Sequence, residues 1–228
     1  MNKYLEIGKI VLEKLNNAGY EAYFVGGTSR DVLLNKDVND IDIATSADPK
    51  EIVLALNEYQ IANKDGVFYG TIKYLIEDIE VEVTSFRKEG IYIGSRRPLN
   101  VSFIKSKEED SFRRDFTINA LYMDKEGNIY DFHNGLNDLK EGIIRTIGDC
   151  KIRLKEDALR ILRAIRFSLE LNMKLSQDII DFVKENNYLL DDLKTNTKNK
   201  ELNKIKKLKS KEELDKIFNE LNIKLEMN

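Results

Sequence analysis

The sequence has little of two residue types on which common chemistries depend. Its 228 residues include one cysteine and one histidine. A single cysteine, Cys150, excludes an intramolecular disulfide and a cysteine metal cluster. The lone His133 is typical of a surface or interface residue rather than a catalyst. Histidine-based nucleophilic chemistry and zinc chemistry are therefore disfavoured.

Long apolar runs are also missing. No apolar run approaches the roughly 20 residues that a membrane span needs. The N-terminal stretch MNKYLEIGKIVLEKL places apolar and charged residues at helical spacing, unlike a signal peptide. With 42% hydrophobic and 34% charged residues, the chain fits one or two globular domains with a real core. We expect a cytoplasmic protein with no membrane partner and no obligate protein partner.

Charge is distributed unevenly along the chain. The net charge of −3 argues against a generic nucleic-acid coat. The stretch KTNTKNKELNKIKKLKSK, residues 194–211, nevertheless holds eight lysines and a single acid, Glu201. Two interpretations stay open, a solvated surface or a contact with a phosphate backbone.

Periodicity divides the chain near residue 150. Before that point, short strand-like runs alternate with helical patterns, and after it the patterns are helical. We therefore predict an α+β fold, with a small mixed sheet and helices followed by a helical region. The expected helices cover residues 3–17, 46–59, 151–170, 176–190 and a final segment capped by Ser210 and Glu213. The expected strands are EAYFVGG, VNDIDIAT, GTIKYLI and DIEVEVTSF, with a polar loop over 87–98 and two short strands around a turn within 127–148.

Two aspartates spaced by one residue form the first candidate site. On a strand, Asp40 and Asp42 would share a face with Cα atoms roughly 6.6 Å apart, and both could bind a hard cation such as Mg²⁺. Glu82, on another predicted strand, could add the third carboxylate of a two-metal site. The alternative is that these acids form exposed polar strand faces.

Two glycines between a strand and a helix form the second candidate site. Gly26 and Gly27 would let backbone N–H groups approach a phosphate closely, and Thr28 or Ser29 would cap the helix. Arg30 in the first helical turn opposes the helix dipole, which a bound triphosphate would explain. The alternative is a tight turn with Arg30 paired to Asp31.

The segment EDALRILRAIRF, residues 156–167, predicts an amphipathic helix. Its polar face would carry Glu156, Arg160 and Arg163. Asp157 lies three residues before Arg160, so the two would be helical neighbours able to hydrogen-bond a base edge. Ordinary surface salt bridging is the alternative. The segment FRRDFTINAL, residues 112–121, adds donors and acceptors suited to ribose and phosphate. The apolar face would be Leu154, Ala158, Ile161, Leu162 and Ile165.

Together, the motifs resemble those of one family. GGTSRDVLL, NDIDIATSA, EVTSFR, RRPLNVSF, EEDSFRRDFTINALYMD and EDALRILRAIRF occur in family order between residues 20 and 172. They resemble the class II tRNA nucleotidyltransferases (CCA-adding enzymes) and bacterial poly(A) polymerases of the polymerase-β-like superfamily. The resemblance implies a nucleotidyltransferase head over 1–148, a helical neck over 149–192 and a short lysine-rich helical segment over 193–228.

The resemblance also implies roles at matching positions. Asp40 and Asp42 would bind the catalytic Mg²⁺ ions, and Glu82 would be an accessory carboxylate. The glycines and Arg30 would hold the triphosphate. The residues implied in nucleotide binding are Gly26, Gly27, Arg30, Arg114, Asp115, Asn119, Asp157, Arg160, Arg163 and Arg166, with Asp157 and Arg160 templating the incoming base.

The implied reaction adds C and A to the 3′ end of tRNA from CTP and ATP, without a nucleic-acid template. The 3′-hydroxyl attacks the α-phosphate, two metals assist, and pyrophosphate leaves. An A-only, CC-only or poly(A)-adding enzyme stays open, as does an inactive RNA-binding module. The loop over 87–98 matches the family's flexible loop, although Ile93 and Gly94 stand where acids are expected.

Length is the main departure from the family. Family members continue through further helical domains that grip tRNA, whereas this chain extends only ~60 residues beyond the templating helix. It is then either a naturally minimal enzyme or a shortened form of a longer family member. In a minimal enzyme, Lys204, Lys206 and Lys207 would be candidates for a reduced tRNA grip.

Overall fold

The computed structural model describes residues 2–90, 92–93 and 97–224. The chain divides into two compact units. The first unit comprises Met1–Gly90, Asn100–Arg114 and Ile118–Leu136. The second comprises Ile91–Leu99, Asp115–Thr117 and Asn137–Asn228. The expected division at residues 148 and 192 stays a prediction, and residues 137–148 group with the helical unit.

A mixed sheet organises the first unit. Its described strands follow the order β11-β10-β1-β2-β5-β4-β3, in which β2 and β5 are parallel and the other neighbours antiparallel. The four expected strands are confirmed with shorter bounds, as β1 (Ala22–Phe24), β2 (Ile41–Thr45), β4 (Thr71–Ile76) and β5 (Ile79–Ser85). Strand β11 (Ile129–Asp131) is the first of the two short strands expected within 127–148. The sheet also contains β3 (Gln60–Asn63) and β10 (Leu121–Met123), which were not among the expected strands.

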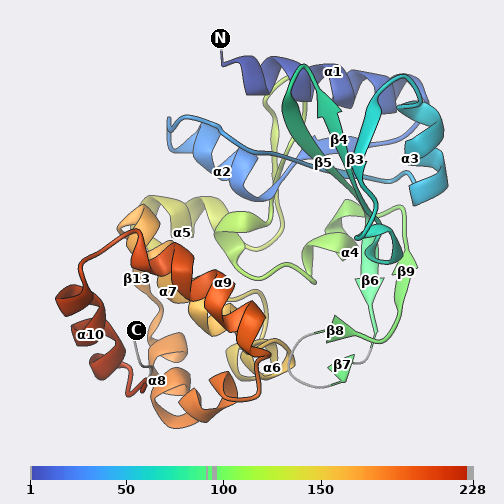
Figure 1. The fold of residues 1–228 in the computed structure, drawn as a ribbon. Coiled ribbons are helices and arrows are strands. Elements are labelled where there is room, and N and C mark those ends of the chain that lie inside the picture. The colour runs from blue at the N-terminus through green and yellow to red at the C-terminus, as the bar shows by residue number, and fades with distance from the viewer. Residues whose placement is uncertain (1, 91, 94–96, 225–228) are drawn as a thin grey trace. The chain divides into compact units, whose positions relative to one another are not determined.

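Helices α1 (Lys3–Asn17) and α3 (Pro49–Ala55) cover one face of this sheet (Figure 1). Their apolar side chains pack against alternate residues of β2 and β5 to form the main core of the unit. The α1 helix was predicted with these bounds. Asp48 begins α3 with a capping box that includes Glu51. Because side chains alternate along a strand, the residues between the core positions of β2 and β5 lie on the opposite face.

The predicted polar loop over 87–98 is wrong in part. Strand β6 (Arg87–Glu89) pairs antiparallel with β9 (Val101–Phe103), where the chain returns after the loop. Strand β7 (Tyr92–Ile93) likewise pairs with β8 (Arg97–Pro98). Gly94, which was compared with the family's acids, lies outside the described residues.

The predicted turn within 127–148 is also wrong. Between β11 and the two-residue β12 (Ile143–Ile144), the chain forms helix α5 (Gly135–Glu141). Asp131 explains why a helix begins here, since its carboxylate accepts from the backbone N–H groups of Gly135 and Leu136. An aspartate acceptor for such N–H groups stabilises a helix start.

The second unit is helical apart from short strand pairs. The apolar face predicted for 154–165 is confirmed as buried core. Strand β13 (Lys174–Leu175), parallel to β12, is a small addition to the expected helical region. The remaining described helices of this unit are α6 (Cys150–Glu156), α7 (Leu159–Leu171), α8 (Gln177–Asn186), the 3₁₀ helix η3 (Asn187–Leu190), α9 (Thr195–Lys206) and α10 (Lys211–Glu220).

The α+β fold class is confirmed. Ser210 and Glu213 form the predicted capping box at the start of α10. None of the described helices is long and apolar enough to cross a membrane.

Candidate active site

Asp42 and Glu82 lie side by side on the face of the sheet opposite the main core. The parallel register of β2 and β5 pairs Asp42 directly with Glu82. Ile41, Ile43, Val81 and Val83 point into the core on the other face. Asp40 is exposed and lies one residue before β2 begins. The structure therefore brings together the carboxylates that the sequence indicated, although Asp40 is not itself in the strand.

The charges around Asp42 are mostly of its own sign. Burial and the negative charges of Glu82 and Asp40 raise the pKa of Asp42 to about 6. The positive charge of Arg114 and a hydrogen bond from the Gly27 backbone N–H act in the opposite direction. A raised carboxylate pKa among other acids indicates a place where a bound cation would relieve repulsion.

The donor set fits Mg²⁺ in part. Among the described residues, no group of three or more His, Cys, Asp or Glu side chains is arranged to hold a metal. Glu82 also has a cationic neighbour, since Lys73 Nζ lies 3.4 Å from its carboxylate. Two carboxylates suffice for an ion that takes its remaining ligands from water and substrate phosphates, as Mg²⁺ usually does.

The helix after the two glycines begins earlier than predicted. Helix α2 spans Gly26–Leu33, and its N-cap residue Val25 makes no side-chain cap among the described contacts. Gly26 has φ +60°, and a Cβ there would lie 3.0 Å from Asp42 Oδ2. Glycine is required here by both its backbone conformation and this close approach.

Thr28 does not cap this helix, contrary to the prediction. Its hydroxyl donates to the Asp40 carbonyl (3.0 Å) and accepts from the Asp42 N–H (2.8 Å). The Thr28 hydroxyl therefore bonds the backbone of Asp40 and Asp42 instead of the N–H groups at the start of α2. These two bonds fix α2 against the residues that carry both aspartates.

Ser29 does not cap the helix either, because its hydroxyl donates to the Leu121 carbonyl of β10 at 2.8 Å. Arg30 is only 4% exposed. It lies in the last turn of α2, where the helix dipole stabilises a positive charge. Its predicted place in the first helical turn is therefore wrong, and no bound triphosphate is needed to explain its position. Its guanidinium contacts Asp31 (2.8 Å) and Asn119 (2.8 Å).

Arg114 belongs to a buried network that sequence reasoning missed. Its Nη2 lies 3.1 Å from Asp110, and its Nε donates to the Tyr122 hydroxyl at 2.9 Å. Asp110 also receives Arg113 Nε at 2.7 Å and the Arg87 N–H at 2.8 Å. These cations and hydrogen bonds hold the pKa of Asp110 at about 2, against the effect of burial. Two arginines three and four residues after an acid were the available signal.

The segment FRRDFTINAL is divided between the two units. Arg114 and Asn119 belong to the first unit, whereas Asp115 belongs to the second. There, Asp115 pairs with Arg163 at 2.6 Å. Thr117, also in the second unit, donates its hydroxyl to the buried Asp138 at 2.7 Å. The expected grouping of Arg114, Asp115 and Asn119 around one nucleotide stays a prediction.

The helix expected through Asp157 is interrupted at that residue. Asp157 ends α6 with extended backbone angles (φ −141°, ψ 96°), and its carboxylate accepts from the Leu159 N–H at 3.1 Å. Asp157 and Arg160 are therefore not neighbours within one helix. The physical reason is that the aspartate side chain competes for backbone N–H groups and starts a new helix.

Arg160 also differs from its expected place on an outer polar face. It is 5% exposed, and its Nη1 donates to the Arg153 carbonyl (2.7 Å) and contacts Glu156 (3.3 Å). These contacts draw the guanidinium toward α6. Base templating by Asp157 and Arg160 stays a prediction.

The single acid of the lysine-rich stretch is turned inward. Glu201 is 5% exposed and accepts a hydrogen bond from Arg166 Nε, whose Nη1 contacts Glu170 at 2.6 Å. Lys204 lies 3.6 Å from Glu201, and its side chain is 61% exposed. Lys207 is exposed and Lys206 partly buried. Both interpretations of this surface stay open.

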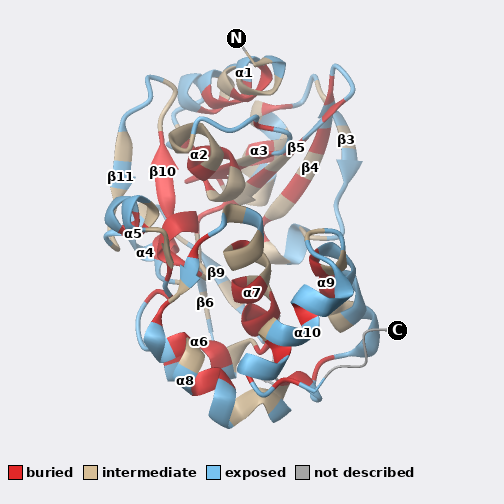
Figure 2. Cartoon of the chain, turned by 90° about the vertical axis from the view of Figure 1, so that its left-hand side faces the viewer, coloured by how far each residue is buried: buried red, intermediate tan, exposed pale blue. Residues whose placement is uncertain are grey.

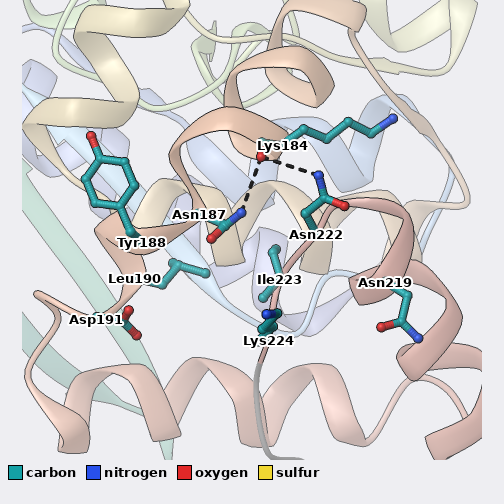
Figure 3. A pocket seen from close by; sticks show the side chains of 9 residues that line it. All are labelled: Lys184, Asn187, Tyr188, Leu190, Asp191, Asn219, Asn222, Ile223 and Lys224. Carbon is teal, nitrogen blue, oxygen red and sulfur yellow. Dashed lines mark hydrogen bonds between the residues drawn. The ribbon is translucent and has the colours of Figure 1, made fainter.

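A hollow of about 510 Å³ lies in the second unit, between the ends of α8 and α10 (Figure 3). None of the candidate site residues lines it. The lining residues are Lys184, Asn187, Tyr188, Leu190, Asp191, Asn219, Asn222, Ile223 and Lys224.

Residues 22–145 match the model of the poly A polymerase head domain. This chain belongs to the poly A polymerase head domain family. The matched residues include the sheet, the acidic strand β2 and the Arg114 network. The family resemblance inferred from the motifs is thereby confirmed.

Named relatives of this head-domain chain agree with the family. It is 48% identical over 184 residues to a CCA-adding enzyme of Ligilactobacillus salivarius, covering 79% of this chain and 44% of that protein. It is 42% identical over 215 residues to a CCA-adding enzyme of Streptococcus uberis, covering 94% and 50%. The chain therefore spans about half the length of the curated relatives it matches.

A solved structure gives the same fold for the head-domain chain. The crystal structure of the Bacillus stearothermophilus CCA-adding enzyme in complex with CTP matches with a TM-score of 0.80 and 36% identity. The match covers 90% of this chain and 49% of that one. The likeness extends beyond residues 22–145 and includes much of the helical unit.

Proposed function

We propose that this chain is an RNA nucleotidyltransferase that adds C and A to the 3′ end of tRNA, using CTP and ATP and no nucleic-acid template. The observation that carries the proposal is the pairing of Asp42 with Glu82 beside Asp40, on a head domain whose relatives are CCA-adding enzymes. A cytoplasmic location is part of the same proposal.

The acidic face supports metal-dependent phosphoryl transfer. Asp40 and Asp42 would hold Mg²⁺, with Glu82 as the accessory carboxylate. A divalent cation bound there supplies stabilisation of the negative charge that develops on phosphate oxygens. Gly26 supports the proposal because its missing Cβ leaves room beside Asp42 Oδ2. The start of α2 supports it because a helix N-terminus favours an anion such as triphosphate.

The cationic residues would position the nucleotide. Arg114, held by Asp110 and Tyr122, would bind the triphosphate or ribose through its guanidinium. Arg30 is fixed by Asp31 and Asn119, so its contribution to the triphosphate would come mainly through its charge. Catalysis would then rest on positioning and charge stabilisation, without a covalent intermediate. Asp157 and Arg160 would select the base, supported by Arg163 and Arg166.

The test is an incorporation assay on a tRNA transcript that lacks its 3′ CCA. We expect two additions with CTP alone, none with ATP alone, and three with both nucleotides. Asp42→Ala should reduce incorporation by roughly 10³-fold or more, because the reaction depends on charge stabilisation at this carboxylate. The matched control is Asp37→Ala, which removes an exposed acid from the segment between α2 and β2. This variant should retain wild-type activity.

The same assay separates the related products. Additions with ATP alone would indicate an A-adding or poly(A)-adding enzyme, and a product that stops after two C residues would indicate a CC-adding enzyme. Equal incorporation by wild type and Asp42→Ala, or none by wild type, would contradict the proposal and favour an RNA-binding module.

A further inference from the structure

Two described hydrogen bonds hold the Arg114 side chain, and a third joins the two groups that accept them. Arg114 Nε donates to the Tyr122 hydroxyl (2.9 Å), and Arg114 Nη2 donates to Asp110 Oδ2 (3.1 Å). The Tyr122 hydroxyl in turn donates to the same Asp110 oxygen at 2.6 Å. A guanidinium is a rigid planar fork, so fixing Nε and one Nη fixes its plane.

The ring of Tyr122 gives its hydroxyl a fixed position. Tyr122 is fully buried on β10, which Figure 2 shows as a buried strand. Its ring makes edge contacts with Tyr23 (6.1 Å between centroids), Phe86 (6.1 Å) and Phe132 (6.2 Å). The Arg114 guanidinium carbon lies 4.9 Å from the centre of the same ring. Aromatic rings packed in this way hold their polar ends with little rotational freedom.

Tyr122 lies on the same face of the sheet as Asp42. Phe24 pairs with Met123 and with Ile43, and all three belong to the core on the other face. Side chains alternate along a strand, so Tyr122 and Asp42 share the face opposite the main core. Arg114 contacts both the hydroxyl and the ring of Tyr122, so its guanidinium lies on the face of the sheet that carries Asp42.

We propose that Tyr122 is a positioning residue for nucleotide binding, whose hydroxyl orients the Arg114 guanidinium toward the triphosphate substrate. It acts through Arg114 and touches no reacting atom. This inference rests on the proposed function and deepens it. It assigns a role to a residue that the sequence motifs did not single out, since a tyrosine in a buried strand is ordinarily a core residue.

Tyr122→Phe tests the inference because it removes only the hydroxyl and keeps the packed ring. The matched control is Tyr74→Phe, which removes the hydroxyl of a tyrosine that is 1% exposed in β4 of the same sheet. That hydroxyl contacts the Ile52 carbonyl at 3.5 Å, on the core face. Both variants lose one buried hydroxyl, so a general effect on folding should appear in both.

We expect Tyr122→Phe to raise the KM for CTP and ATP by about tenfold, as for the loss of a hydrogen bond to a charged group, while kcat changes by less than about twofold. Equilibrium binding of CTP should weaken by the same factor. Tyr74→Phe should leave both KM values unchanged. A drop in kcat with unchanged KM would indicate only a smaller folded fraction and would overturn the inference.

Arg114→Lys provides the decisive second variant, because lysine keeps the charge and lacks Nε. If Tyr122 acts through Arg114, adding Tyr122→Phe to Arg114→Lys should change KM by less than about twofold. A second tenfold loss in the double variant would show that Tyr122 acts by another route. If Tyr122→Phe and Tyr74→Phe both retain wild-type activity and have the same KM values, this inference alone is overturned. A wild type that neither incorporates nor binds CTP would overturn the proposed function as well.

Discussion

Asp42 and Asp110 are two acids of the same unit in opposite surroundings. Asp42 has Glu82 and Asp40 as neighbours, and its pKa rises to about 6. Asp110 contacts Arg113, Arg114 and the Tyr122 hydroxyl, and its pKa falls to about 2. The charge of the first acid is only partly compensated by Arg114 and the Gly27 N–H, so it suits a ligand of opposite sign. The second is compensated within the protein and holds other side chains in place.

The second unit repeats this contrast with cations. Arg166 is compensated, because it contacts both Glu201 and Glu170. The lysine-rich stretch around Glu201 has eight lysines against that single acid. Charge that the protein compensates therefore organises the fold, whereas charge in excess marks the surfaces that a ligand would contact.

Removing Asp110 should have the largest effect. Asp110→Asn keeps the shape of the side chain but removes the carboxylate charge that pairs with Arg113 and Arg114, so the free energy of unfolding should fall by roughly 3 to 5 kcal/mol. Urea unfolding at pH 7 measures this change.

The pH dependence at Asp110 follows from its lowered pKa. The ionised carboxylate stabilises the fold above its unfolded pKa of 3.8, and this stabilisation is lost as the pH falls through about 2. In Asp110→Asn, this part of the acid dependence should be absent. Equal stability of wild type and variant at pH 7 would show that Asp110 is not the anchor that its contacts indicate.

Changing Asp42 should raise the free energy of unfolding, whereas changing Asp110 should lower it. A carboxylate whose pKa is raised from 3.8 to about 6 destabilises the folded state increasingly as the pH rises through that window. In EDTA at pH 7, Asp42→Asn should therefore unfold at higher urea than wild type, by about 1 to 3 kcal/mol. The difference should nearly vanish at pH 4.

Added Mg²⁺ sharpens this comparison. Ion binding should stabilise wild type through mass action and leave Asp42→Asn much less affected. Added Mg²⁺ should still stabilise Asp110→Asn, because Asp110 does not belong to the group formed by Asp40, Asp42 and Glu82. A destabilised Asp42→Asn in EDTA would contradict the interpretation of Asp42 as an only partly compensated charge.

The smallest effect is expected at the lysine surface. Changing Lys204, Lys206 and Lys207 together to Gln should raise the KM for tRNA and reduce the slope of log K against log salt by up to about 0.7 per lost phosphate contact. The matched control changes the exposed Lys36, Lys50 and Lys64 of the first unit. Identical tRNA KM and salt slope in the two triple variants would indicate an ordinary solvated surface.

Local signals in the sequence predicted much of the fold. The apolar period of 3–17, the alternation around Asp42 and Glu82 and the Ser210–Glu213 cap each depend on residues close in the chain. Such short-range patterns specify helices, strands and their buried faces. The motifs and their order along the chain were sufficient to indicate the family.

Only the tertiary structure decided which partners the polar groups chose. Thr28 and Ser29 could cap a helix locally, yet their hydroxyls bond backbone of other segments. The direct pairing of Asp42 with Glu82, and of Tyr122 with Arg114 and Asp110, depends on strand register and packing. A buried polar group takes whichever partner the fold brings within hydrogen-bonding distance, and chain separation alone does not specify that partner.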